Sequence, residues 1–277
     1  LWAAPAFSFD IESTSLDPYK DLPHKPAVLM FSFSCASKTA YALPVAHKEA
    51  PWTHKALDYI LKWVERLLSR GPDDGVTKIP HNGQFDTKYL RGVYGWDVTN
   101  DFDTLLAHYT AITEEKGTHG LKILAWQYTD MGGYDDPLDE YKQAHPEADP
   151  ERGGNYGEIP LDTLWKYAAA DADCTFRLYE EFYPKVEAEF KDLFHNIVMP
   201  ATNALGYIES TGAPIDKQWL KHCQTEYPRL LNETLDRLRE FPEVLRLERI
   251  LTKQAKKKKQ ADRVKRFRSR ADAIAEL

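Results

Sequence analysis

Long apolar runs, paired cysteines and a leader segment are all missing from the amino-acid sequence. No apolar stretch approaches the ~20 residues that a membrane-spanning helix needs. The start, LWAAPAFSFD, has no initiator methionine, and it has neither the basic region nor the long apolar stretch of a signal peptide. We therefore expect a cytoplasmic protein that is not secreted and contacts no membrane. We also expect this sequence to be a piece of a longer chain.

Cysteine is scarce as well. The three cysteines, Cys35, Cys174 and Cys223, are far apart and form no CxxC pair. An odd number of widely spaced cysteines argues against a disulfide framework and against a zinc site made of cysteine thiolates. We expect three reduced thiols, as in other cytosolic proteins.

The remaining composition is that of a folded protein with an uneven charge. Of the 277 residues, 43% are hydrophobic and 29% are charged, which excludes the disordered class. The net charge is −7, but residues 246–277 hold twelve basic and four acidic side chains, and their +8 leaves −15 for the remainder. An acidic body with a basic tail is typical of a metal-dependent enzyme beside a polyanion-binding segment. A solvated helix has the same pattern, so charge alone does not decide.

The order of apolar patterns predicts an α/β fold. Residues 6–13, 27–37 and 38–45 read as strands and predict an antiparallel meander. Strands first, followed by strand–helix alternation, indicate a mixed central sheet flanked by helices. The alternation consists of helices over 53–70, 83–95, from near Asp103 and over 120–129, with a short buried strand over 76–82.

The segment that follows, residues 130–160, is rich in Gly, Pro, Asp and Glu. It predicts a long irregular loop, which we expect to be the most mobile part of the first domain. Residues 161–183 then predict a strong amphipathic helix that begins near Pro160–Asp162.

A change of pattern at Val186 divides the chain. From there onward the apolar spacing is purely helical. We therefore predict two domains, an α/β domain over 1–190 and an all-α segment over 191–277. Its helices are expected over 194–212, ending at Gly212, over 217–241, with a kink at Pro228, and over 250–270.

Three short segments carry candidate catalytic residues. Asp10 and Glu12 are two apart in a predicted strand, so both carboxylates lie on one face. Asp86 stands just inside the start of a predicted helix. Tyr167 and Asp171 are four apart on a helix and share a face, whereas Asp173 faces elsewhere, where we expect it to be solvated or to cap a neighbour.

Each of these features alone also fits an ordinary structural role. The acidic pair fits an exposed sheet edge, Asp86 fits a partner of the helix dipole, and a tyrosine and an aspartate at this spacing are common. Together, four carboxylates and a tyrosine from a first strand, a middle helix and a last helix can converge at one sheet edge. An oxygen-rich site of this kind suits Mg²⁺ or Mn²⁺. A pair of such ions is a recurring device for phosphodiester cleavage.

The three segments FDIEST, HNGQFDTKYL and YAAADADCTFRLY resemble the three exonuclease motifs of the DEDD superfamily, and Tyr167 marks its tyrosine-bearing branch. The chain is most similar to the 3′→5′ proofreading domain of family A DNA polymerases of the bacterial polymerase I and phage type. The segments DTLLAHY, GLKILAWQY and MPATNALGYIESTGAPID extend the resemblance over roughly residues 5 to 225, up to the start of the polymerase thumb. It implies a ribonuclease H-like fold and removal of nucleotides from DNA 3′ ends.

The resemblance also implies a role for each site residue and two divalent ions, Mg²⁺ or Mn²⁺. Asp10 would bridge both ions, Glu12 and Asp171 would complete the shell of the first, and Asp86 would hold the second, partly through water. We expect Tyr167 to orient the attacking water by a hydrogen bond, because a phenol with a pKa of about 10 is a poor base at pH 7.

Two further residues are candidates for binding the DNA 3′ end. Leu16 lies six residues after Asp10, where the family has a leucine that wedges against the terminal base; ordinary core or turn packing is the alternative. Asn82 offers an amide to a sugar or phosphate, or else caps the following helix.

The basic tail is a third candidate for binding DNA. By resemblance it is the tip of a polymerase thumb that contacts duplex phosphates regardless of sequence, and the alternative is a solvated charged helix. No polymerase carboxylates follow it, so we expect no DNA synthesis from this piece. The candidate DNA-binding residues of the tail are Lys256, Lys257, Lys258, Lys259, Arg263 and Arg266.

The expected partners are the primer 3′ end, both single-stranded and in a primer–template, together with replication proteins. Two other readings stay open. A ribonuclease D-like exoribonuclease has the same five site residues, and a scaffold would hold DNA without cutting it. The complete carboxylate set argues against the scaffold, because a protein that only binds has no use for converging like charges.

Overall fold

The computed structural model describes residues 1–19 and 25–275, with side chains described as far as residue 259. The chain forms two compact units, Leu1–Gly212 and Ala213–Leu277.

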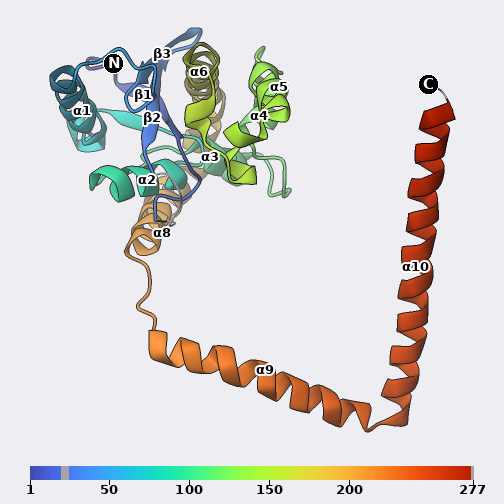
Figure 1. The fold of residues 1–277 in the computed structure, drawn as a ribbon. Coiled ribbons are helices and arrows are strands. Elements are labelled where there is room, and N and C mark those ends of the chain that lie inside the picture. The colour runs from blue at the N-terminus through green and yellow to red at the C-terminus, as the bar shows by residue number, and fades with distance from the viewer. Residues whose placement is uncertain (20–24, 276–277) are drawn as a thin grey trace. The chain divides into compact units, whose positions relative to one another are not determined.

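The first unit is organised around a four-stranded sheet with strand order β3-β2-β1-β4 (Figure 1). Strands β1, β2 and β3 pair antiparallel as a meander, and β4 pairs parallel to β1. The predicted mixed sheet is therefore confirmed. The strands are β1 (Ala6–Ser13), β2 (Val28–Ala36), β3 (Thr39–Pro44) and β4 (Thr77–Ile79).

The two faces of β1 differ because successive side chains of a strand alternate. Phe7, Phe9 and Ile11 point to one face, where they form a buried core with helices α1 (His54–Leu68) and α2 (Gln84–Tyr94). Ser8, Asp10 and Glu12 occupy the other face. That face therefore carries the polar residues of β1.

Helix α6 (Leu161–Lys185) covers this polar face, on the side of the sheet opposite α1 (Figure 1). Small residues allow the helix to approach closely: the Ser8 hydroxyl donates to the carbonyl oxygen of Ala172 over 2.6 Å. On β2, the residues opposite Ser8 and Asp10 are both serines. Because the helix approaches so closely, it brings Asp171 next to β1.

The segment over 130–160 contradicts the prediction of an irregular loop. It contains helix α5 (Asp136–Ala144) and three short 3₁₀ turns. Leu138, Ala148 and Ile159 are buried there in a core shared with Leu164 of α6. Apolar packing against α6 therefore orders a segment whose local composition favours turns. Helices α3 (Thr104–Ala111) and α4 (Leu121–Tyr128) precede it as predicted.

The chain after α6 stays helical up to Gly212, which ends α8 with a φ of 70°. Asn203 of α8 joins the loop before α3 through two 2.9 Å hydrogen bonds with the backbone of Asn100. The first compact unit therefore includes α8, beyond residue 190, and a functional boundary near 190 stays a prediction. The elements are η5 (Val186–Phe190), α7 (Lys191–Leu193), η6 (Phe194–Val198) and α8 (Met199–Thr211), with η5 and η6 π-helical.

The second unit consists of α9 (Lys217–Arg239) and α10 (Pro242–Ala275). Helix α9 continues through Pro228, and the predicted basic helix lies within α10. The side chains of Lys256–Lys259 are exposed, whereas those of Arg263 and Arg266 lie outside the described residues. In the described ranges, no helix combines the length and the apolar character needed to cross a membrane.

The start of α2 leaves no room for a side chain at Gly83. A Cβ there would lie 2.3 Å from Cγ of Pro80 and 2.6 Å from Oδ1 of Asn100. We expect Gly83→Ala to lower the free energy of unfolding by about 1–3 kcal/mol, because overpacking forces these neighbours apart. The measurement is a urea titration beside Gly120→Ala, a position with no atom within 4 Å of the added Cβ, where less than about 0.5 kcal/mol is expected. Equal losses in both variants would contradict the packing argument.

Candidate active site

A pocket of about 190 Å³ opens where the carboxyl half of β1 meets α6 and the start of α2. It gathers all seven candidate residues that the sequence placed in the first domain. Acidic, polar, aromatic and apolar side chains line it. Its lining is Asp10, Ile11, Glu12, Ser13, Leu16, His81, Asn82, Phe85, Asp86, Pro150, Glu151, Tyr156, Tyr167 and Asp171.

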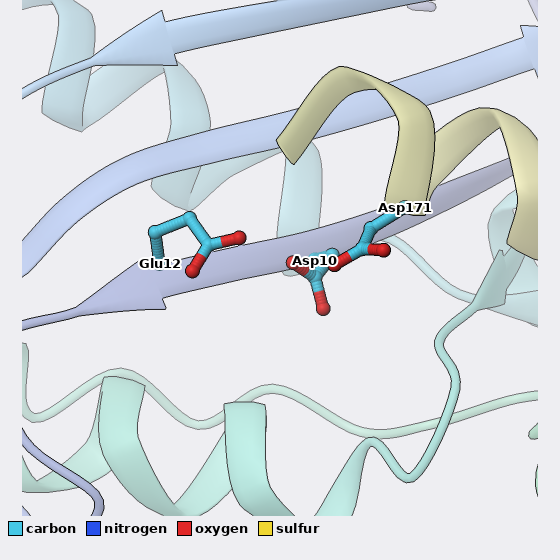
Figure 2. Close-up of side chains that lie close together, drawn as sticks. All are labelled: Asp10, Glu12 and Asp171. Carbon is cyan, nitrogen blue, oxygen red and sulfur yellow. The ribbon is translucent and has the colours of Figure 1, made fainter. Parts of the chain in front are cut away.

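Three carboxylates form the centre of this pocket. One oxygen from each of Asp10, Glu12 and Asp171 lies within 4.8 Å of the others. Figure 2 shows Asp10 and Glu12 projecting from the same strand and Asp171 reaching the same space from α6. The prediction that strand alternation puts Asp10 and Glu12 on one face and that α6 brings Asp171 to them is confirmed.

Asp86 lies in the same pocket but outside this group of three. It is in the first turn of α2, as predicted, and its side chain is 2% exposed. Its Oδ1 accepts a hydrogen bond from the backbone N–H of Ile11 over 3.1 Å. This bond ties the start of α2 to β1, between the two carboxylates of the strand.

Burial and the neighbouring negative charges raise the pKa values of these carboxylates. Burial raises the pKa of Asp10 well above its usual value, and the charges of Asp86, Asp171 and Glu12 add to the effect. Burial likewise raises the pKa of Glu12 and brings that of Asp86 to about 8. Like charges held together out of water favour a bound cation.

Three neighbouring side chains stabilise the charged form of Asp171. Burial raises its pKa, and the positive charge of Lys122 and hydrogen bonds from Tyr134 and Tyr167 oppose that rise. The tyrosine at i−4 therefore reaches the carboxylate on the shared helix face, as its spacing predicts. Burial, with the nearby charges of Asp171 and Glu12, raises the pKa of Tyr167 well above its usual value, so its hydroxyl stays protonated.

Lys122, Tyr134 and Tyr156 are site residues that sequence reasoning missed. Lys122 donates to the Tyr167 hydroxyl over 2.9 Å, Tyr134 donates to Asp171, and Tyr156 lines the pocket. Tyr134 and Tyr156 lie in the segment interpreted as a loop. No local pattern marks them, because only the packing of that segment against α6 brings them to the carboxylates.

Leu16 and Asn82 both line the pocket. Leu16 is 54% exposed, which argues against core packing and leaves its side chain accessible from the pocket. Asn82 has a φ of 59°, and Gly83 takes the N-cap position of α2 without a side-chain cap. The capping role is therefore wrong for Asn82, and its amide stays available to a ligand.

Asp173 faces away from the pocket, as predicted. Of its two predicted roles, the solvated side chain is wrong, because Asp173 is 7% exposed, and the capping of a neighbour is confirmed. Its carboxylate accepts the backbone N–H of Lys38 over 2.7 Å and pairs with Arg177 on the next turn of α6. Asp173 therefore fastens α6 to the turn between β2 and β3.

The donor set fits a hard divalent cation. Asp10, Glu12 and Asp171 offer carboxylate oxygens within reach of one another, and Mg²⁺ and Mn²⁺ prefer such ligands. Among the described residues, Oε1 of Glu12 is buried without a hydrogen-bond partner. A cation between the three carboxylates would satisfy that oxygen and offset their repulsion.

Comparison with known proteins identifies the family. The family model for a 3′–5′ exonuclease matches residues 1–187, which is well over half of the chain. This chain belongs to the 3′–5′ exonuclease family of family A DNA polymerases. It therefore carries a DEDD-type exonuclease domain, and such domains are metal-dependent.

The relatives of this exonuclease are polymerases. It is 36% identical over 244 residues to a DNA polymerase of Bacillus phage SP01 and 38% identical over 227 residues to one of Escherichia phage T5. These alignments cover 86% and 77% of the exonuclease chain. They cover only 25% and 26% of the two polymerases, so the chain spans about a quarter of their length.

Solved structures support the fold of the exonuclease. Brucella melitensis NrnC matches with a TM-score of 0.54 at 20% identity, covering 78% of this chain and 91% of that one. The POL domain of Pol1 from M. smegmatis matches with a TM-score of 0.52 at 17% identity, covering 83% and 33%. The ribonuclease H-like fold expected from the motifs is confirmed.

The raised pKa of Asp86 predicts how stability depends on pH. An unfolded aspartate titrates near pH 4, so between about pH 4 and pH 8 the folded state binds the extra proton. The contribution of this proton on Asp86 to the free energy of unfolding is fully present below pH 4 and is lost as the pH rises through 8. In EDTA, we expect the melting temperature of the wild type to fall more between pH 6 and pH 9 than that of Asp86→Asn.

Asn at position 86 keeps the acceptor for Ile11 but does not titrate, so it is a matched control. Between pH 6 and pH 9, the melting temperature of the wild type should fall by at least about 2 °C more than that of Asp86→Asn. This difference corresponds to roughly 1 kcal/mol for a domain of this size. Parallel pH profiles for the two proteins would contradict the burial of a titrating Asp86.

Proposed function

We propose that this chain removes nucleoside monophosphates one at a time from DNA 3′ ends, as the proofreading part of a longer family A DNA polymerase. The observation that carries the proposal is the convergence of Asp10, Glu12 and Asp171 in one pocket with Asp86 and Tyr167. The family match and the two phage polymerases support DNA as the substrate. Because the chain spans about a quarter of those polymerases, DNA synthesis belongs to the rest of such a protein.

The carboxylates bind the cofactor in this proposal. Asp10 would bridge two divalent ions, Mg²⁺ or Mn²⁺, with Glu12 and Asp171 on the first and Asp86 on the second. When bound, such ions lower the pKa of an attacking water and stabilise the charge on the leaving 3′ oxygen. The raised pKa values of the carboxylates support this assignment, because burial and mutual repulsion raise them and a bound cation offsets both effects.

The remaining residues position the reactants. The water oxygen forms a bond to the terminal phosphorus and the bond from phosphorus to the 3′ oxygen breaks. The 3′ oxygen of the shortened strand takes up a proton, and a nucleoside 5′-monophosphate is released. The protonated hydroxyl of Tyr167 donates a hydrogen bond that orients the water, and it does not take a proton from it.

Substrate selection would depend on the rim of the pocket. Leu16 is exposed there and would pack against the terminal base, while the Asn82 amide would contact its sugar or phosphate. An unpaired end reaches such a pocket at a lower cost than a paired end, and single strands place bases on apolar side chains readily. The exposed lysines 256–259 of α10 would contact duplex phosphates without regard to sequence.

The proposal is tested by the end that is cut and by its pairing. A 5′-labelled primer should shorten stepwise, and a 3′-labelled primer should release its label as a mononucleotide at once. A primer with a mismatched 3′ end should shorten faster than a matched one. Release of long fragments would indicate an endonuclease, and equal rates at matched and mismatched ends would argue against proofreading.

A further inference from the structure

We propose that Lys122 is a positioning residue for Tyr167. By donating a hydrogen bond to the Tyr167 hydroxyl oxygen, Lys122 leaves the hydroxyl proton pointing to the carboxylate side of the pocket. The inference rests on the proposed exonuclease function. Lys122 is the second residue of α4, 45 positions before Tyr167 in the sequence. Its Nζ lies 2.9 Å from the Tyr167 hydroxyl oxygen.

The direction follows from the chemistry of the two groups. A lysine ammonium has three N–H donors and no acceptor, and a tyrosine hydroxyl has one proton. In the 2.9 Å bond the Tyr167 oxygen must therefore accept. Its single proton is left for another acceptor in the pocket that Tyr167 and the carboxylates line. Lys122 thus allows the hydroxyl to act as a donor on the side of the metal ligands.

Lys122 is itself held in place from several sides. Its Nζ lies 3.4 Å from the carboxylate of Asp135, which is 8% exposed at the start of α5. The ammonium also stands 4.3 Å from the ring centre of Tyr167 and 5.7 Å from that of Tyr134. A cation held over two aromatic faces and beside a buried carboxylate has few other positions available.

Tyr134 completes the arrangement. Its ring stacks on that of Tyr167 with centres 6.1 Å apart, and its hydroxyl donates to Asp171. The ring and the hydroxyl of Tyr167 are therefore fixed by two neighbours, one on α4 and one in the segment before α5.

A direct contact between Lys122 and the substrate phosphate is the alternative. Tyr167 lines the pocket, whereas Lys122 is absent from the pocket wall that the described residues form. The two roles differ in kinetics. A residue that acts through the Tyr167 hydroxyl affects the chemical step and lowers kcat, whereas a residue that binds phosphate in the ground state raises KM.

The test is a double-mutant cycle on a 5′-labelled single-stranded oligodeoxynucleotide in saturating Mg²⁺. We expect Lys122→Met to lower kcat about tenfold with KM changed less than about twofold, because the hydroxyl loses its fixed direction. In Tyr167→Phe the hydroxyl is absent, so adding Lys122→Met should lower kcat by less than about threefold more. Lys122→Arg keeps a cationic donor and should recover kcat to within about threefold of the wild type.

Lys185→Met is the matched control. Lys185 also stands over two aromatic rings, about 6 Å from each, and pairs with a carboxylate, but it lies 14 residues after Asp171 on α6, about 21 Å along the helix. It should keep wild-type kcat. If Lys122→Met has a lower melting temperature than the wild type, kcat of the wild type, Lys122→Met and Lys122→Arg is compared at a lower temperature at which all three proteins are folded.

Three results would overturn the inference: an unchanged kcat in Lys122→Met, a raised KM alone, or losses that multiply in the double variant. A wild type that cleaves no oligodeoxynucleotide would instead contradict the proposed function. The two failures are therefore distinguishable in one experiment.

Discussion

Replacing Asp10 and Glu12 together by alanine is expected to lower kcat on a DNA 3′ end by at least about 10³-fold, because the change removes two of the three clustered carboxylates. Of the three clustered carboxylates, Asp171 alone cannot hold an ion in the same place. The loss of the ion removes several kcal/mol of transition-state stabilisation. The measurement is single-turnover cleavage of a 5′-labelled oligodeoxynucleotide.

The fold of this double variant should survive and gain stability. Burial and mutual repulsion raise the pKa values of Asp10 and Glu12 in the folded state, so in metal-free buffer at pH 7 their removal relieves the strain of like charges. A higher melting temperature in EDTA together with lost cleavage would show that the variant is folded and lacks only the catalytic site.

An exposed acidic pair provides the control. Glu114→Ala with Glu115→Ala changes the net charge by the same amount on a loop far in sequence from the three motifs. That variant should cleave like the wild type. Cleavage retained in the variant of Asp10 and Glu12 would contradict the site assignment.

Tyr167→Phe is expected to lower kcat by about 10²-fold, the size of losing one positioned hydrogen bond to a reacting group. The ring keeps its packing on Tyr134, so the fold should not change. Because the raised pKa of Tyr167 keeps its hydroxyl protonated, the pH profile of the variant should keep the shape of the wild-type profile.

The phenylalanine variant is compared with Tyr59→Phe, which removes a hydroxyl from a tyrosine that is 74% exposed on α1. That control should be fully active. A Tyr167→Phe enzyme with wild-type kcat would show that the hydroxyl orients no reactant, and a profile that loses its alkaline side would show that the tyrosine acts as a base.

Strand alternation made much of this site predictable. In β1 the apolar residues fill one face and Ser8, Asp10 and Glu12 fill the other, so the sequence alone places the two carboxylates together. Helical spacing does the same for Tyr167 and Asp171. Both are local periodicities, and a local periodicity survives folding wherever one face of the element is buried.

The surroundings of the carboxylates were not predictable in this way. Tyr134 and Tyr156 reach them from a segment rich in glycine and proline, and α5 is ordered by burial of Leu138 against α6. Lys122 is on α4, where a single lysine on a short helix gives no signal. Such contacts depend on tertiary packing, which overrides the local preference for turns.

The end of the first unit shows the same limit. The helical pattern begins at Val186 and predicts a functional boundary near residue 190, which stays a prediction. The pattern does not show that α8 is joined to the α/β unit by the hydrogen bonds of Asn203 with Asn100. Periodicity reports which elements are helical and does not report what they pack against. The compact unit therefore ends at Gly212.

The central claim, that this chain is a metal-dependent 3′→5′ exonuclease acting on DNA, is tested most directly by one time course. A 5′-labelled primer–template with a mismatched 3′ end is incubated with Mg²⁺ or Mn²⁺, beside an EDTA control and an RNA strand of the same sequence. The predicted result is a ladder that shortens from the DNA 3′ end only with metal, with the RNA spared. Preferential degradation of the RNA would contradict the claim in favour of a ribonuclease D-like enzyme, and intact binding without cleavage of either strand would contradict it in favour of a scaffold.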